Sequence, residues 1–203
     1  FIIRVLILFV LGSCSAYAEI RQTHDLQSIK REIFASSKDT LVVFDIDFVL
    51  VTPTDDVFLL TITEEGQQLQ SNIYDDLWKR LPKHSVDELH TILMTTQDWR
   101  PVTPNTAQVF NQIRAKGYKV LGLTALITGS VGVIPSMESW RAEQLERLGI
   151  VFDKSFVNAK SGSLDPYITG ISDYYSKSQR ASFPTAYNGI IFTTFIPKGE
   201  ALN

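Results

Sequence analysis

The sequence predicts an α/β fold with a central parallel sheet, and three observations lead to this prediction. Residues 41–46, L-V-V-F-D-I, form a continuous apolar run typical of a strand that is buried on both faces. Residues 118–124, Y-K-V-L-G-L-T, form a second such run, and a helical pattern ending at Gly117 lies directly before it. Strand, helix and strand in this order make a βαβ crossover, so we expect helices on both faces of the sheet.

Three helices are expected around these strands. Residues 25–36 carry apolar side chains on one helical face behind Asp25, which can act as an N-cap. A second helix is expected to begin with Thr103 as its cap and Pro104 at its first position. Residues 136–148 predict a third helix, closed by a glycine.

The rest of the chain adds an insert and two further strands. Residues 54–102 are too many for an ordinary βα connection, so we interpret them as an inserted cap that carries short helices at 75–78 and 86–94. Residues 150–152 predict one strand. A tight turn at Asn188-Gly189 precedes another over residues 190–195.

Composition and charge limit the class of protein. The chain has 203 residues, 44% hydrophobic and 20% charged, as expected for one globular domain. The formal net charge of -3 provides no basic surface for a phosphate backbone, so nucleic acid is not an expected partner. Cys14 is the only cysteine, which excludes a disulfide within the chain.

The first 18 residues have the order of a secretory signal. Arg4 precedes the apolar run V-L-I-L-F-V-L, and small residues ending in A-Y-A follow it. We predict cleavage after Ala18, a mature domain over residues 19–203, and an exported location, periplasmic or secreted, with no stable membrane span after cleavage. Two alternatives stay open: a buried N-terminal strand, and a lipoprotein site in which Cys14 of L-G-S-C is acylated.

Polar residues at strand ends carry the predicted chemistry, because ligands bind beyond the carboxyl ends of strands in open α/β sheets. Asp45 and Asp47 end the first strand, Thr124 ends the second, and Lys198 follows the strand at 190–195. The two aspartates lie close together, so a divalent cation would relieve their repulsion, and Mg²⁺ prefers such oxygen ligands. Asp45 would then attack phosphorus and Asp47 would protonate the leaving oxygen. A pair of surface aspartates that starts a turn is the plain alternative.

The string V-V-F-D-I-D-F-V-L resembles motif I of the haloacid dehalogenase superfamily. V-L-G-L-T, ending at Thr124, is similar to its motif II, and Lys198 is similar to its motif III lysine. The layout is also similar to an uncharacterised bacterial family of exported proteins of this type. The resemblance implies a Rossmann-like three-layer sandwich with an inserted cap, phosphate-binding roles for Thr124 and Lys198, and an aspartate at 47 typical of the phosphatase branch.

One part of the superfamily pattern is missing. Motif IV supplies a further acidic metal ligand after the motif III lysine, and the sequence stops at residue 203 before any such segment, so we expect a C-terminally shortened chain with impaired turnover. Asp153 and Asp173 precede Lys198 and are poor substitutes. The predicted function is Mg²⁺-dependent hydrolysis of a small phosphate monoester through an aspartyl-phosphate. The alternative is a catalytically inactive exported binding protein that keeps the same frame.

Overall fold

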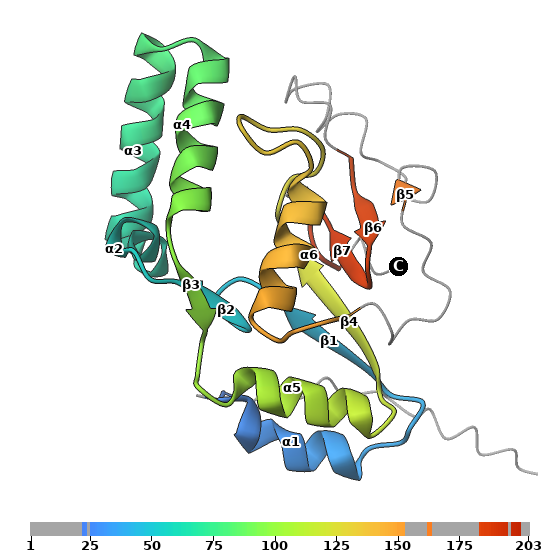
Figure 1. The fold of residues 1–203 in the computed structure, drawn as a ribbon. Coiled ribbons are helices and arrows are strands. Elements are labelled where there is room, and N and C mark those ends of the chain that lie inside the picture. Colours follow the sequence, from blue (N-terminus) through green and yellow to red (C-terminus); the bar gives the residue numbers. More distant parts are fainter. Residues whose placement is uncertain (1–21, 24, 153–161, 164–182, 195, 200–203) are drawn as a thin grey trace, which may run out of the picture.

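The computed structural model describes residues 22–23, 25–152, 162–163, 183–194 and 196–199, and it has a mixed α/β fold (Figure 1). Five strands form one sheet in the order β1-β4-β7-β6-β5. Their bounds are β1 Leu41–Asp45, β4 Lys119–Thr124, β5 Gly162–Ser163, β6 Thr185–Tyr187 and β7 Ile190–Phe192. The first three in spatial order run parallel, and β6 and β5 are added antiparallel. The predicted α/β class with parallel pairing is therefore confirmed.

Three helices share one hydrophobic core with the sheet. They are α1 Leu26–Ala35, α5 Thr106–Ala115 and α6 Met137–Arg147. Side chains from all three helices belong to the same buried cluster as strand residues Phe44, Val120 and Ile190. Phe110 of α5 lies at its centre, with ring centroids 5.5 Å from Phe44 and 4.8 Å from Phe152.

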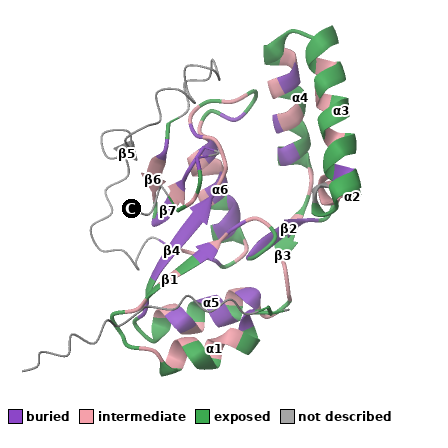
Figure 2. Ribbon diagram, turned by 180° about the vertical axis from the view of Figure 1, so that it is seen from behind, coloured by how far each residue is buried: buried purple, intermediate pink, exposed green. Residues whose placement is uncertain are grey.

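The prediction of a central first strand buried on both faces is wrong for the described residues. There β1 pairs with β4 alone and is the edge strand of the sheet. Its side chains alternate: Phe44 is 3% exposed, whereas Leu41 and Val43 are 42% and 37% exposed. Among the described helices, α1, α5 and α6 all contribute to the same core cluster as Phe44, and Figure 2 shows the buried residues of α5 and β4. The expected second helical layer is thus not found in this part of the chain.

The helix ends follow local capping chemistry. Asp25 caps α1 by accepting a hydrogen bond of 2.8 Å from the backbone of Ser28, as predicted, and Ser136 caps α6. The second helix begins later than predicted, at Thr106, because the hydroxyl of Thr103 bonds with the side chains of Asn105 and Thr106 instead of capping a longer helix. The resulting local turn takes the place of the first helical turn.

The insert is a helical hairpin on a two-stranded stalk. Strands β2 Val51–Pro53 and β3 Trp99–Pro101 pair antiparallel, and between them lie α2 Asp56–Leu59, the short 3-10 helix η1 Leu60–Ile62, α3 Glu64–Arg80 and α4 Lys83–Thr96. Helices α3 and α4 stand side by side away from the sheet (Figure 1). The insert is helical as predicted, but its two main helices are longer than the segments 75–78 and 86–94. Both helices carry many polar residues, so the pattern of apolar residues predicts only part of each helix.

The hairpin of β6 and β7 confirms the predicted Asn188-Gly189 turn. Both turn residues have positive φ, 47° and 73°. A side chain at Gly189 would place a Cβ 2.9 Å from the carbonyl oxygen of Phe152, so glycine is required there. The predicted strand over residues 150–152 is wrong: Ile150 and Phe152 enter the core without pairing to the sheet.

Several predictions concern residues outside the described part of the chain. The signal sequence at residues 1–18, with Cys14, lies there, as do Asp153 and Asp173. Within the described part, no helix has the length and apolar character needed to cross a bilayer.

Candidate functional site

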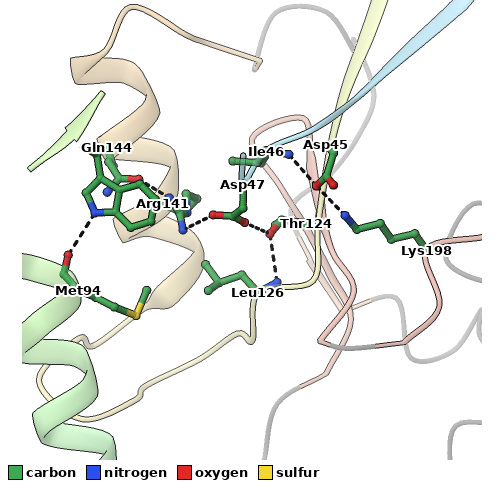
Figure 3. Close-up of polar contacts among 10 residues, drawn as sticks. Asp45, Ile46, Asp47, Met94, Thr124, Leu126, Arg141, Gln144 and Lys198 are labelled. Carbon is green, nitrogen blue, oxygen red and sulfur yellow. Dashed lines mark hydrogen bonds and ion pairs between the residues drawn. The ribbon is translucent and has the colours of Figure 1, made fainter. Parts of the chain in front are cut away.

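The candidate site lies where β1 and β4 end (Figure 3). Asp45 is the last residue of β1 and Thr124 the last of β4. After Asp45 the backbone turns tightly: Leu50 and Val51 both donate to the carbonyl oxygen of Ile46, at 3.0 and 3.1 Å. This closed turn fixes Asp47 beside the end of β4. Carboxyl ends of neighbouring parallel strands meet at one edge, so the topology by itself brings these side chains together.

Asp45 is paired with Lys198, and only one of its two oxygens has partners among the described residues. Its Oδ1 lies 2.6 Å from Nζ of Lys198 and accepts a 2.8 Å hydrogen bond from the backbone of Ile46. No described residue donates to Oδ2. The two side chains of the pair are 40% and 35% exposed, so this carboxylate is reachable from solvent.

Asp47 has partners on both oxygens. Oδ1 accepts a 2.8 Å hydrogen bond from Nη2 of Arg141, and Oδ2 accepts one of 2.9 Å from the hydroxyl of Thr124. That hydroxyl itself accepts from the backbone of Leu126 at 3.1 Å, so its own proton is directed to Asp47. Two donors on two oxygens is the arrangement that suits a carboxylate.

Arg141 of α6 is the most buried charge of the site. Its side chain is 1% exposed and lies over two indole rings, 4.5 Å from the centroid of Trp99 and 4.9 Å from that of Trp140. Gln144 accepts from its Nη1, while its buried Nε has no partner among the described residues. Burial lowers the pKa of Arg141, and the negative charge of Asp47 opposes this shift. The guanidinium stays charged at neutral pH.

The structure brings together all four residues predicted from the sequence, but in two pairs. Lys198 contacts Asp45, whereas Thr124 contacts Asp47 and not Asp45. The sequence analysis missed Arg141, although a signal exists. Arg141 stands four residues after Met137 and four before Leu145, both buried, so a charge occupies a core position of the helix.

Among the described residues, Asp45 and Asp47 are the carboxylates that the end of β1 offers to a cation. Within the described ranges there is no group of three or more His, Cys, Asp or Glu side chains that could enclose a metal ion. Mg²⁺ commonly takes only one or two carboxylates from the protein and completes its shell with waters and phosphate oxygens. Asp45 can supply one such carboxylate, whereas Asp47 can supply a second only through the lone pairs that its hydrogen bonds from Arg141 and Thr124 leave free.

Comparison with known proteins corrects the resemblance drawn from the sequence motifs. Residues 22–203 match the model of one family, described as a protein of unknown function (DUF2608). A curated relative, "Uncharacterized protein RP296" of Rickettsia prowazekii (strain Madrid E), is 26% identical over 195 residues. That alignment covers 93% of this chain, and the chain spans 63% of the relative's length. No solved structure matches.

These matches contain nothing that points to the haloacid dehalogenase superfamily. The assignment made from Asp45, Asp47, Thr124 and Lys198 is therefore wrong. The three motifs behind it are short, and two of them consist of one residue type at a strand end, a pattern that unrelated α/β proteins share. The chemistry of the site has to be argued from its geometry.

Proposed function

The chain belongs to the family of proteins of unknown function DUF2608, and for this member we propose Mg²⁺-dependent hydrolysis of small phosphate monoesters through an aspartyl-phosphate at Asp45. One observation carries the proposal. Asp45 is a solvent-reachable carboxylate at the end of a parallel strand, held on Oδ1 by Lys198 and Ile46, and none of the residues that the structure describes donates to its Oδ2. A carboxylate fixed on one oxygen presents the other as a nucleophile.

The first step forms one bond and breaks another. Oδ2 of Asp45 attacks phosphorus, the bond from phosphorus to the ester oxygen breaks, and the leaving alkoxide takes a proton from Asp47. A proton on Asp47 occupies one carboxylate oxygen, so one of the two hydrogen bonds that Asp47 accepts has to break. The hydrogen bond from Thr124 can break, because the hydroxyl can rotate about its C–O bond, whereas Arg141 is held in place.

The second step restores the site. Water gives a proton to Asp47 and its oxygen attacks phosphorus, so the acyl-phosphate bond breaks and inorganic phosphate leaves. Lys198 would offset the negative charge that gathers on the transferred group, since its Nζ lies 2.6 Å from Oδ1 of the same carboxylate. The Thr124 hydroxyl donates to Asp47 while Asp47 is ionised.

Mg²⁺ would be held by Asp45 and Asp47, and it would supply positive charge to the phosphoryl oxygens. The finer features of the fold are part of the same proposal. The parallel order of β1, β4 and β7 supports a Rossmann-like sheet with residues 54–102 as its cap, whereas the second helical layer of a three-layer sandwich is not found among the described residues. The proposal also includes export through residues 1–18 and a bacterial origin. The partner would be a small phosphate ester and not nucleic acid.

Hydrolysis of p-nitrophenyl phosphate by the whole protein with Mg²⁺ tests the proposal. Asp45→Asn should lower kcat by a factor of at least about a thousand, because the amide is not a nucleophile. Asp76→Asn is the matched control: Asp76 is an exposed aspartate 2.9 Å from Arg80, and its variant should keep the rate of the native protein. An Asp45→Asn protein as fast as this control would end the proposal.

A catalytically inactive binding protein is the second candidate, and the same site offers one observation in its favour. Each aspartate already has a cation beside it, Lys198 or Arg141, which is a stable arrangement without any metal. Titration with Mg²⁺ and beryllofluoride separates the two functions. An inactive protein should bind neither, whereas the hydrolase should bind both and lose beryllofluoride binding in Asp45→Asn.

A further inference from the structure

The surroundings of Arg141 are unfavourable for a residue whose task is stability alone. Burying an ion pair costs a large part of the hydration energy of both ions, and apolar residues of similar volume often serve as well or better. The neighbours of Arg141 one turn away, Met137 and Leu145, are apolar and buried. The Nε of Arg141 also has no hydrogen-bond acceptor in the described part of the chain. An apolar side chain would avoid both costs, so the cation has a use elsewhere.

The direction of its hydrogen bonds indicates that use. Nη2 binds Asp47 and Nη1 binds Gln144, so both ends of the guanidinium are engaged (Figure 3). A planar group with two fixed ends defines the orientation of the carboxylate that it binds, which a lysine ammonium cannot do. Asp47 is 32% exposed and lies in a loop, and its contact with Arg141 ties it to a helix of the core.

A tryptophan of the insert packs against Arg141 and restricts its position. Trp99 belongs to β3, the returning strand of the stalk, and its ring centroid lies 4.5 Å from the guanidinium carbon. The indole nitrogen of Trp99 donates to the carbonyl oxygen of Met94 in α4, at 3.3 Å, which fixes the ring. Trp140, on the helix of Arg141 itself, covers the cation at 4.9 Å. The two indole rings meet edge to face, and their faces exclude water and attract the cation.

We infer that Arg141 is a positioning residue that sets the orientation of Asp47, and that Trp99 of the insert holds Arg141 in place for this task. The base of the insert therefore takes part in supporting one of the two carboxylates. The catalytic consequence rests on the proposed function, whereas the contact between Trp99, Arg141 and Asp47 does not.

Turnover of p-nitrophenyl phosphate tests the catalytic consequence. Arg141→Lys keeps the charge but loses the planar, two-ended contact, and Trp99→Leu removes the aromatic wall. Both should lower kcat about ten- to a hundredfold and leave KM within about twofold, as expected when a catalytic group is misplaced. Trp99→Phe, which keeps an aromatic face, should recover most of the loss. Trp78→Leu, at an exposed tryptophan of the same insert, should turn over like the native protein.

Thermal unfolding of the whole protein tests the contact without using activity. The single variants Trp99→Leu, Arg141→Met and Asp47→Asn are compared with the double variants that combine Arg141→Met with each of the other two. Residues in contact couple, so the shifts in Tm of both pairs should deviate from additivity by at least about 3 °C. Combining Trp78→Leu with Arg141→Met is the control and should be additive.

The outcomes separate the two proposals. Non-additive shifts together with lower kcat in Arg141→Lys and Trp99→Leu support the inference. Additive shifts in either pair, or a kcat of Trp99→Leu equal to that of Trp78→Leu, overturn it. A native protein that hydrolyses no phosphate ester ends the proposed function, and the unfolding cycles then decide the inference alone.

Discussion

Asp45 and Asp47 are the same residue type two positions apart, yet the structure gives them opposite surroundings. Asp45 faces a partly exposed lysine and has an oxygen without a donor among the described residues. Asp47 faces an arginine that is almost fully buried against two indole rings, and both of its oxygens are occupied. The difference teaches that one carboxylate is available for reaction while the other is held in a defined orientation. A nucleophile and a group that transfers protons need these two environments.

The largest effect on stability is expected for Asp47→Asn. The substitution leaves the guanidinium of Arg141 buried without its counter-ion, so the free energy of unfolding should fall by about 3–5 kcal/mol. Chemical denaturation measures this, with Asp76→Asn as the exposed control that should change the free energy by less than about 1 kcal/mol. A loss in Asp47→Asn no greater than that of the control would mean that Arg141 does not depend on Asp47.

Removal of the arginine should cost less than removal of its partner. Arg141→Met leaves an apolar side chain among the tryptophans, and the stranded Asp47 can be reached by water, so we expect a loss of about 1–2 kcal/mol. The same denaturation experiment gives this value. A larger loss than that of Asp47→Asn would reverse the contrast between the buried and the exposed partner.

On the other side of the site, Lys198→Met should change the free energy of unfolding by no more than about 1 kcal/mol, because the pair with Asp45 is partly exposed. Added salt should weaken the Lys198–Asp45 contact and leave the Arg141–Asp47 contact nearly unaffected. Under the proposed function, the same variant should lower kcat about a hundredfold. Denaturation at low and high salt, with steady-state kinetics, checks all three statements.

The smallest effect concerns a neighbouring threonine. The hydroxyl of Thr124 donates a hydrogen bond to Asp47. The backbone of Thr193 donates to the carbonyl oxygen of Thr124 at 2.8 Å, but the buried hydroxyl of Thr193 has no partner among the described residues. Thr193→Val should therefore be neutral or stabilise by up to about 1 kcal/mol, while Thr124→Val should destabilise by a similar amount. Equal effects of the two substitutions in thermal unfolding would contradict this difference.

The sequence by itself was sufficient for the elements whose signals are local. The caps at Asp25 and Ser136, the turn at Asn188-Gly189 and the buried strand ending in Thr124 were all predictable from a few adjacent residues. Short-range hydrogen bonds and backbone preferences decide these features, and both depend on residues that are adjacent in the sequence. The placement of Asp45 and Asp47 at a strand end followed from the same kind of signal.

Only the tertiary structure decided how the site is assembled. Strand order determines three features of the site. Lys198 contacts Asp45, Thr124 donates to Asp47 instead, and β1 lies at the sheet edge among the described residues. Arg141 and Trp99 meet although forty-two positions separate their numbers, because α6 and β3 pack against each other beside the sheet. Contacts between distant segments depend on how whole elements pack, and no local pattern in a single sequence records that packing.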